Sequence, residues 1–187
     1  MFGSLAVSAV LSVAIGLVLA QRSDAPTTGD DVAVIDVDPT LASPSIGVND
    51  KVEGRPLPTA TVRTLAGDPV ETASLVGQPL VINVWASTCG PCKAELPDFA
   101  AAHVRFGDTV RFVGIDYLPP SETEEQFARD KGVQYELLYD ADGEFISAAG
   151  IATFPVTLFV APDGTIVEQT GQLDEGQIAA LVAEHFG

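Results

Sequence analysis

The chain has 187 residues, 26 of them acidic and 9 basic, so its formal net charge is −17 at neutral pH. A length of this order accommodates one domain with additional segments. The strong negative charge argues against nucleic acid and against an anionic membrane surface as binding partners.

The first 20 residues are apolar. The run from 2 to 20 has 19 residues without a charge, and as a helix, at about 1.5 Å per residue, it would be about 28 Å long, just enough to cross a bilayer. We therefore expect residues 1–20 to form a hydrophobic helix that is retained as a signal-anchor. A signal peptide cleaved after Ala20 is the alternative, because small residues precede that position.

Residues 21–50 have the composition of a flexible tether. The segment holds six aspartates and three prolines, so it has little to bury and its like charges repel. We expect it to be extended and disordered. The remaining residues, 51–187, carry 8 basic and 20 acidic side chains, a net charge of −12, and are numerous enough to form a folded domain.

This domain is expected to alternate strands and helices. Strands are predicted at 57–64, 80–86, 109–116, 133–139, 156–161 and 166–170, and helices at 91–105, 121–131, 143–149 and 173–186, with a turn at 67–69 and a helical turn at 71–76. Segment 57–64 is predicted to be an edge strand. Segment 80–86 is apolar apart from Asn83, a pattern that is typical of a strand buried on both faces. His103 and Val104 fall on the apolar face of the first helix, and Ser121 with Glu124 forms a capping box for the second. The order predicts an α/β fold: a central mixed sheet, parallel first and antiparallel last, flanked by helices.

The only two cysteines of the chain stand in the motif Cys89-Gly90-Pro91-Cys92, directly after the strand at 80–86. At this spacing the second thiol can close on the first as a disulfide and reopen. A helix that begins here directs its N–H groups and its positive dipole end at Cys89, which favours the reactive thiolate. Gly90 and Pro91 define the helix start, where proline is tolerated. The motif therefore predicts a redox centre in which Cys89 is the nucleophile and Cys92 the resolving thiol.

A purely structural role fits the two cysteines less well. A structural disulfide that closes so short a loop constrains the unfolded chain little. A zinc site needs about four ligands, and the chain offers two cysteines and two histidines without ligand spacing between them. We expect neither a metal nor a cofactor.

A longer stretch around the motif resembles a known family. Residues 75–87, then Cys89–Lys93 and Glu95–Pro97, and Thr153-Phe154-Pro155 before a later strand, are similar to the TlpA/ResA-like branch of the thioredoxin superfamily. The resemblance covers about 53–187, including an extra helix–strand insert at about 118–149. It implies a thioredoxin-like fold and an extracytoplasmic, membrane-anchored thiol–disulfide oxidoreductase.

The resemblance also implies roles for individual residues. Pro155 would be cis and, with Phe154 and Trp85, would belong to the surface that receives a partner protein; Trp85 is also expected to pack beneath the redox loop. Glu95, one turn after Cys92, would tune that thiol or carry its proton. Asn83 stands where thioredoxin has a buried aspartate.

Two positions depart from the pattern of the family. Thr88 replaces the tryptophan that is common before the cysteine pair, and Phe154 replaces the small or aliphatic residue that is common before the proline. A bulky ring at Phe154 is expected to change the choice of substrate or the redox potential.

The direction of electron flow stays open in the sequence. The protein could reduce disulfides, for example in apocytochrome c, with electrons from a membrane donor. It could instead oxidise exported proteins with the help of a membrane acceptor. A thiol peroxidase is disfavoured because Ile82 and Ala86 stand where that class has proline and threonine. A copper(I)-binding module is disfavoured because relatives of that kind space their cysteines by three residues and add a histidine.

The location is expected to be outside the cytoplasm, where disulfide chemistry is useful. We expect a single-pass protein of the cell membrane with its redox domain on the extracytoplasmic side. Cleavage after Ala20 would make it a secreted protein instead.

Overall fold

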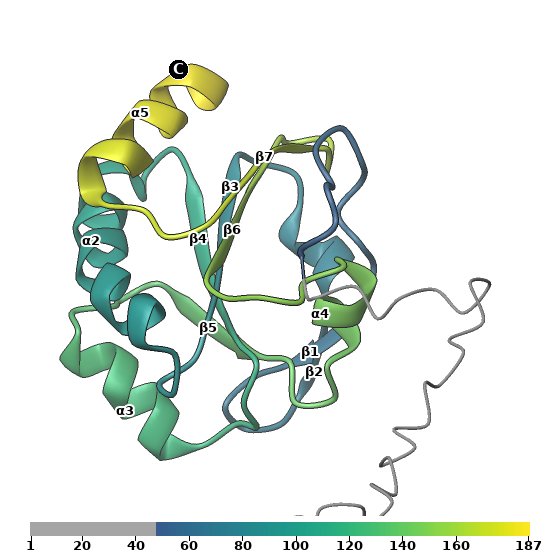
Figure 1. Ribbon diagram of the computed structural model, residues 1–187, viewed down its shortest axis with the longest axis vertical. Coiled ribbons are helices and arrows are strands. Elements are labelled where there is room, and N and C mark those ends of the chain that lie inside the picture. The colour runs from purple at the N-terminus through teal and green to yellow at the C-terminus, as the bar shows by residue number, and fades with distance from the viewer. Residues whose placement is uncertain (1–47) are drawn as a thin grey trace, which may run out of the picture. The chain divides into compact units, whose positions relative to one another are not determined.

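The computed structural model describes residues 48–187 (Figure 1). The hydrophobic helix predicted at 1–20 and most of the predicted tether, 21–47, lie outside the described residues. Within 48–187, no helix combines the length and apolar character that crossing a membrane requires.

A seven-stranded mixed sheet forms the centre of the fold, in the order β2-β1-β5-β4-β3-β6-β7. Its strands are β1 (Thr61–Arg63), β2 (Pro69–Glu71), β3 (Leu80–Trp85), β4 (Arg111–Asp116), β5 (Glu136–Tyr139), β6 (Val156–Val160) and β7 (Ile166–Thr170). The three central strands β3, β4 and β5 run parallel, and β6 and β7 are antiparallel to their neighbours. The predicted mixed sheet is confirmed.

The sequence predicts the first strand at the edge of the sheet, and this position is wrong. β1 is not at the edge, because it pairs with β2 on one side and with β5 on the other, antiparallel to both. β2 takes the edge, and it uses Pro69, for which the sequence predicts a turn. Only three residues form β2, too few to show the alternation by which a strand is found in a sequence.

Helices cover both faces of the sheet. They are the 3₁₀ turn η1 (Thr72–Leu75) and the helices α2 (Gly90–Phe106), α3 (Glu122–Asp130), α4 (Glu144–Ala148) and α5 (Glu175–Phe186). Figure 1 shows α2, α3 and α5 on one side of the sheet and α4 on the other. The segment predicted as the insert, 118–149, carries α3, β5 and α4, and β5 enters the sheet between β1 and β4.

Strand β3 is buried along its whole length and contributes to two hydrophobic cores. Val81 and Trp85 belong to the core under α2, whereas Ile82 and Val84 belong to the core on the opposite face. Alternate residues of a strand point to opposite faces, so Asn83 lies on the same face as Val81 and Trp85. The register of β3 thus directs one amide toward α2.

Helix α2 differs from the prediction at one position. Val104, expected on the apolar face, is 83% exposed, and Ala102 is buried instead. His103 is half-buried, and its ring packs edge-on against Phe112 at 5.7 Å and against Tyr135 at 5.5 Å. His103 therefore lies on the packed face of α2, as predicted.

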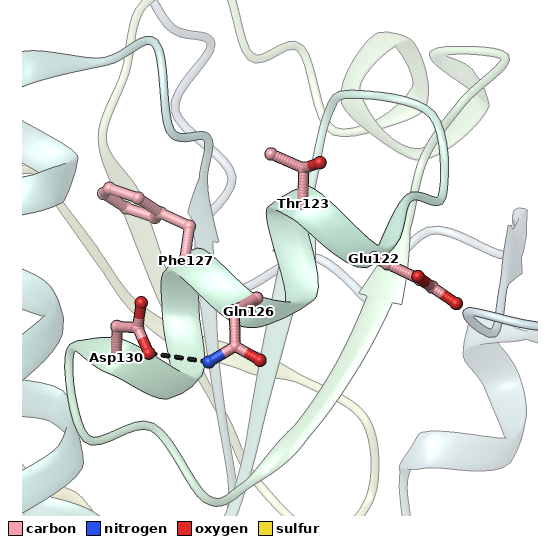
Figure 2. Close-up of a pocket in the computed structure, with 5 residues that line it drawn as sticks. All are labelled: Glu122, Thr123, Gln126, Phe127 and Asp130. Carbon is pink, nitrogen blue, oxygen red and sulfur yellow. Dashed lines mark hydrogen bonds between the residues drawn. The ribbon is translucent and has the colours of Figure 1, made fainter.

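Helix α3 borders a hollow of about 530 Å³ (Figure 2). Its described lining comes from that one helix: Glu122, Thr123, Gln126, Phe127 and Asp130. Within it, Gln126 Nε2 donates a hydrogen bond of 2.6 Å to Asp130 Oδ1. None of the residues predicted to carry chemistry lies in this described lining.

Candidate active site

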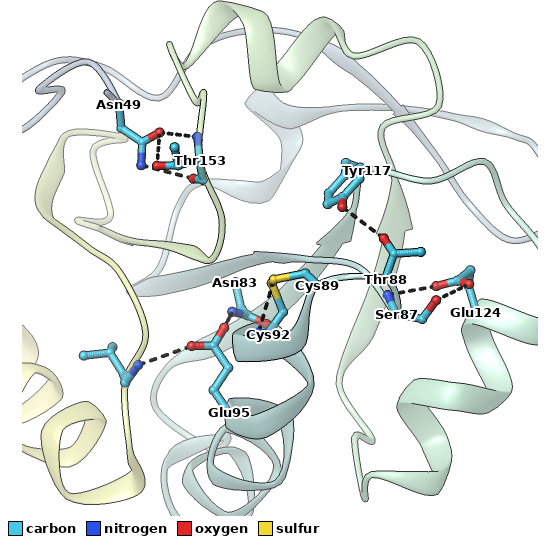
Figure 3. Close-up of a disulfide and its surroundings, with 11 residues drawn as sticks. Asn49, Asn83, Ser87, Thr88, Cys89, Cys92, Glu95, Tyr117, Glu124 and Thr153 are labelled. Carbon is cyan, nitrogen blue, oxygen red and sulfur yellow. Dashed lines mark hydrogen bonds between the residues drawn. A yellow bond between two sulfur atoms is a disulfide. The ribbon is translucent and has the colours of Figure 1, made fainter. Parts of the chain in front are cut away.

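Cys89 and Cys92 lie together at the N-terminus of α2 and are joined by a disulfide (Figure 3). Cys89 is the N-cap residue, and its Sγ accepts a hydrogen bond of 3.2 Å from the backbone N–H of Cys92. Cys89 is half-buried, whereas Cys92 is completely buried. A partner can therefore reach only the first sulfur, and the helix terminus offers that sulfur an N–H donor and the positive end of its dipole.

Glu95 is completely buried one helical turn after Cys92. Its Oε1 accepts a hydrogen bond of 2.7 Å from Asn83 Nδ2, and its Oε2 accepts one of 3.2 Å from the N–H of Leu173 (Figure 3). Burial raises the pKa of Glu95 to about 7, against the opposing effect of these two donors, and nearby Asp98 adds to the rise. The carboxyl group can therefore bind or release a proton near neutral pH, beside the buried thiol.

Asn83 is the partner that links β3 to this carboxyl group. Its Oδ1 is buried and has no hydrogen-bond partner among the described residues, although its Nδ2 is bonded to Glu95. Asn83 is thus hydrogen-bonded through its amide nitrogen, and its amide oxygen is left without a partner among the described residues. A rotation of the amide would present Oδ1 to a protonated Glu95, so the pair can accommodate either protonation state.

The loop that contains Pro155 carries the second predicted part of the site. The Phe154–Pro155 peptide bond is cis, in agreement with the resemblance. Phe154 is half-buried and its ring stacks on Tyr117, with ring centroids 4.3 Å apart. The Tyr117 hydroxyl lies 3.1 Å from Thr88 Oγ1, within hydrogen-bond distance. Tyr117 therefore connects Thr88 with Phe154, the two positions at which the chain departs from the family pattern.

Trp85 lies beneath the redox loop. It is completely buried and stacks on Phe127, with centroids 6.2 Å apart. The predicted packing role is confirmed, but the predicted contact with a substrate is wrong for this structure, because a side chain without exposed surface meets no partner. Pro155 is also buried, which leaves Phe154 as the accessible residue of the predicted binding group.

A second buried carboxyl group lies at the carboxyl end of β4. Asp116 Oδ1 accepts a hydrogen bond of 2.8 Å from the N–H of Leu118, and Oδ2 has no partner among the described residues. Burial raises the pKa of Asp116 to about 8; the N–H of Leu118 opposes the rise, and neighbouring Glu124 adds to it. Glu124 in turn accepts hydrogen bonds from Ser87 Oγ at 2.6 Å and from Ser87 N at 3.2 Å.

The contacts of Glu124 revise the predicted capping box. Ser121 caps α3, since its Oγ accepts a hydrogen bond of 3.2 Å from the N–H of Glu124. The Glu124 carboxylate, however, binds Ser87 rather than returning to Ser121. Helix α3 thereby holds the loop that leads into Cys89.

The sequence pattern does not reveal four residues that contact the site: Ser87, Asp116, Tyr117, and Asn49, whose Oδ1 accepts a hydrogen bond of 2.8 Å from the N–H of Thr153. Asp116 and Tyr117 follow a buried parallel strand, and polar residues at the carboxyl end of such a strand are a known indication of a site. Asn49 lies in a stretch with the composition of a linker, where nothing in the sequence indicates a structural role.

Comparisons with known proteins agree with this geometry. Residues 54–169, more than half of the chain, match the AhpC/TSA family. The chain belongs to the AhpC/TSA family. It is 27% identical over 128 residues to the thiol-disulfide oxidoreductase ResA of Bacillus subtilis, an alignment that covers 67% of this chain and 72% of that protein.

Solved structures extend the comparison. A secreted disulfide oxidoreductase of Mycobacterium tuberculosis, described as homologous to DsbE of E. coli, is 29% identical with a TM-score of 0.55, over 65% of this chain and 95% of that one. A protein of Bacteroides thetaiotaomicron, described as a putative protein disulfide isomerase, is 28% identical with a TM-score of 0.62, over 71% and 86%. The thioredoxin domain of an oxidoreductase from Bacteroides vulgatus, at 19% identity and a TM-score of 0.65 over 74% and 100%, supports the fold alone. The predicted thioredoxin-like fold and the resemblance to the TlpA/ResA-like branch are confirmed, and the chain is a thiol:disulfide oxidoreductase.

Proposed function

We propose that this AhpC/TSA-family protein is a membrane-tethered reductant that works outside the cytoplasm on disulfides of partner proteins, with apocytochrome c as a substrate. The observation that carries the proposal is the asymmetric pair at the start of α2, in which Cys89 is half-buried and Cys92 is completely buried. Such a pair accepts a partner at one sulfur and keeps the second sulfur for release.

The reaction follows from that asymmetry. In the reduced enzyme, the Cys89 thiolate attacks one sulfur of a partner disulfide, a bond forms between the two sulfurs, and the other partner sulfur leaves as a thiolate that takes a proton. The Cys92 thiol then loses its proton and attacks Cys89 Sγ. The second partner thiolate leaves and is protonated, so two electrons have passed from the enzyme dithiol to the partner, and the Cys89–Cys92 disulfide seen here has formed.

Glu95 is placed to handle the proton in the second step. It lies one turn after Cys92 on α2, and its pKa of about 7 lets it accept the thiol proton at neutral pH and return it when the enzyme is reduced again. Asn83 holds the carboxyl group in place through its hydrogen bond of 2.7 Å. The proton of the buried Cys92 thiol can therefore pass to a buried carboxyl group instead of to solvent water.

The proposed location rests on the sequence and on one relative. The uncharged run at 2–20 is long enough to anchor the chain, and the similar structure from Mycobacterium tuberculosis is of a secreted protein. Fractionation of cells that express the full chain, with protease added from outside, tests this location. The redox domain is expected in the membrane fraction and accessible to the protease; a soluble cytoplasmic protein would contradict it.

The proposed direction of electron flow is supported by the dipeptide between the cysteines. Gly90-Pro91 is shared with thioredoxin, a reductant with a potential of about −270 mV. We expect the Cys89–Cys92 couple, equilibrated with glutathione or dithiothreitol in the full-length protein, to have a potential near that value or lower. A value of about −120 to −180 mV would indicate an oxidant or isomerase of exported proteins instead.

The proposed substrate has its own test. An oxidised peptide with the Cys-x-x-Cys-His sequence of a haem attachment site should be reduced faster by the reduced full-length protein than a scrambled peptide with the same disulfide loop. Equal rates for the two peptides would remove apocytochrome c from the proposal and leave a general reductant.

A further inference from the structure

We propose that Asn49 is a positioning residue for partner binding: its carboxamide occupies both backbone groups of Thr153, so that Phe154 is the first residue of the loop free to pair with a partner strand. This inference rests on the proposed function, since it concerns the loop that would receive the partner. It assigns a role to a residue from a segment that the sequence marks as a linker.

The contacts of Asn49 are concentrated on one short stretch (Figure 3). Its Oδ1 accepts hydrogen bonds from the N–H of Ala152 at 2.8 Å, the N–H of Thr153 at 2.8 Å and the hydroxyl of Thr153 at 3.2 Å. Its Nδ2 donates to the carbonyl oxygen of Thr153 at 3.2 Å. The amide thereby engages the N–H and the C=O of the same residue, as a neighbouring strand would.

The residues after Asn49 keep this side chain in place. The N–H of Asp50 donates to the carbonyl oxygen of Gly150 at 2.9 Å, and the N–H of Val52 donates to Gln169 Oε1 at 3.1 Å. The backbones approach so closely that a Cβ on Gly150, whose φ is +63°, would lie 2.5 Å from Asp50 Cβ. Val52 is itself buried in the core. Residues 49–52 are therefore held against the loop by hydrogen bonds and by the burial of Val52.

The other side of the loop is held by aromatic packing. Phe154 stacks on Tyr117, and Tyr117 reaches Thr88 in the redox loop. Among residues 48–187, Phe154 contributes neither its N–H nor its C=O to a backbone hydrogen bond. With both backbone groups of Thr153 occupied by Asn49, Phe154 is the next residue of the loop and has both backbone groups unpaired in the described part of the chain, which sets the register in which a partner peptide can add as a strand.

This arrangement predicts that Asn49 acts on partners with a peptide backbone and not on the thiol chemistry itself. A small disulfide without peptide groups has nothing to pair with the loop, so its exchange with Cys89 is independent of the placement of Phe154. A protein disulfide depends on both. The two kinds of substrate therefore separate a positioning role from a general loss of structure.

The test uses the full-length protein and two probes, insulin as the protein disulfide and hydroxyethyl disulfide as the small one. Asn49→Ala should raise the KM for insulin about tenfold with little change in kcat, because four hydrogen bonds to the loop are lost. Its rate constant with hydroxyethyl disulfide should stay at the wild-type value. Asn49→Asp keeps the accepting oxygen but loses the donor to the carbonyl oxygen of Thr153, and its KM should lie between those of the wild type and Asn49→Ala.

Two matched variants complete the design. Thr153→Val removes only the hydroxyl contact with Asn49 and should have a small effect, and Gln134→Ala removes an exposed amide elsewhere and should have none. If Asn49→Ala fails to fold, Asn49→Asp and Thr153→Val still show whether the KM for insulin rises as hydrogen bonds between residue 49 and Thr153 are removed. Unchanged insulin kinetics in Asn49→Ala, or an equal loss with both probes, would overturn the positioning role. A wild-type protein that exchanges with neither probe would instead overturn the proposed function, and this inference with it.

Discussion

Replacing Glu95 with glutamine should make the folded protein more stable at neutral and alkaline pH but not in acid. Glu95 is completely buried, and its pKa is raised from 4.5 to about 7, mainly by that burial. Glutamine has nearly the same shape and no proton to lose. After a rotation of Asn83, whose Oδ1 now lacks a partner among the described residues, the new amide can donate to that oxygen and still accept from the N–H of Leu173.

The size and sign of the effect follow from the linkage between proton binding and folding. Below pH 4.5 Glu95 is protonated in both the folded and the unfolded state, so the two proteins differ little. Between 4.5 and about 7 the unfolded chain releases the proton and the folded chain keeps it, so the wild type loses stability as the pH rises. Since a tenfold change in acidity is worth about 1.4 kcal/mol, the full loss is about 3 kcal/mol, complete above pH 7.

Denaturant unfolding of the oxidised full-length wild type and Glu95→Gln, followed from about pH 4 to pH 8.5, measures this difference. Trp85 is the only tryptophan of the chain and is completely buried, so its fluorescence reports loss of the core. Asp116 also titrates in this range, but it is present in both proteins and its contribution cancels. A difference in stability that does not depend on pH would refute the assignment of Glu95 as a buried acid with a raised pKa.

Two further predictions concern the cysteines and the second acid. Cys92→Ser should accumulate a mixed disulfide between Cys89 and its partner, visible as a thiol-sensitive band on a non-reducing gel, whereas Cys89→Ser should trap nothing; adducts in both variants would contradict the assigned order of attack. Asp116→Asn should gain stability over the wild type as the pH rises toward 8, because the folded aspartate keeps its proton, with a pKa of about 8, after the unfolded one has lost it. A variant that loses stability on the same rise in pH would show that the ionised carboxylate is needed instead.

Much of the fold could be predicted because its central strands carry strong local patterns. The apolar run at 80–86 and the motif that follows place β3, Cys89 and α2 close to where they lie. The strand β2 could not be predicted, because its three residues are held by pairing with β1 rather than by a pattern of their own. The prediction for Val104 is wrong because a valine at helical spacing indicates a buried face only when an element packs against that face, and Val104 is exposed.

The residues of the site also divide into those that local sequence predicts and those that it does not. The cysteine pair is local in sequence and is found from its spacing. Glu95 could be assigned to the site by resemblance, but its pKa is set by burial, which raises it, and by hydrogen bonds from Asn83 and Leu173, which lower it and come from other parts of the chain. Contacts over such distances along the chain, as between Asn49 and Thr153, leave no trace in local composition.

Asn83 stands where thioredoxin has an aspartate, and this difference affects how the carboxyl group of Glu95 titrates. Asn83 and Glu95 lie within 2.7 Å of each other on facing elements, β3 and α2. An aspartate at 83 would place two carboxyl groups at hydrogen-bond distance in a dry site, where they could not both ionise and would share one proton. One of the two would then titrate far from neutrality and be of little use as a proton carrier. With an amide at 83, Glu95 faces no second carboxyl group from β3 and its pKa is about 7, so in the proposed reaction the orientation of Asn83 toward α2 leaves this carboxyl group able to exchange a proton near neutral pH.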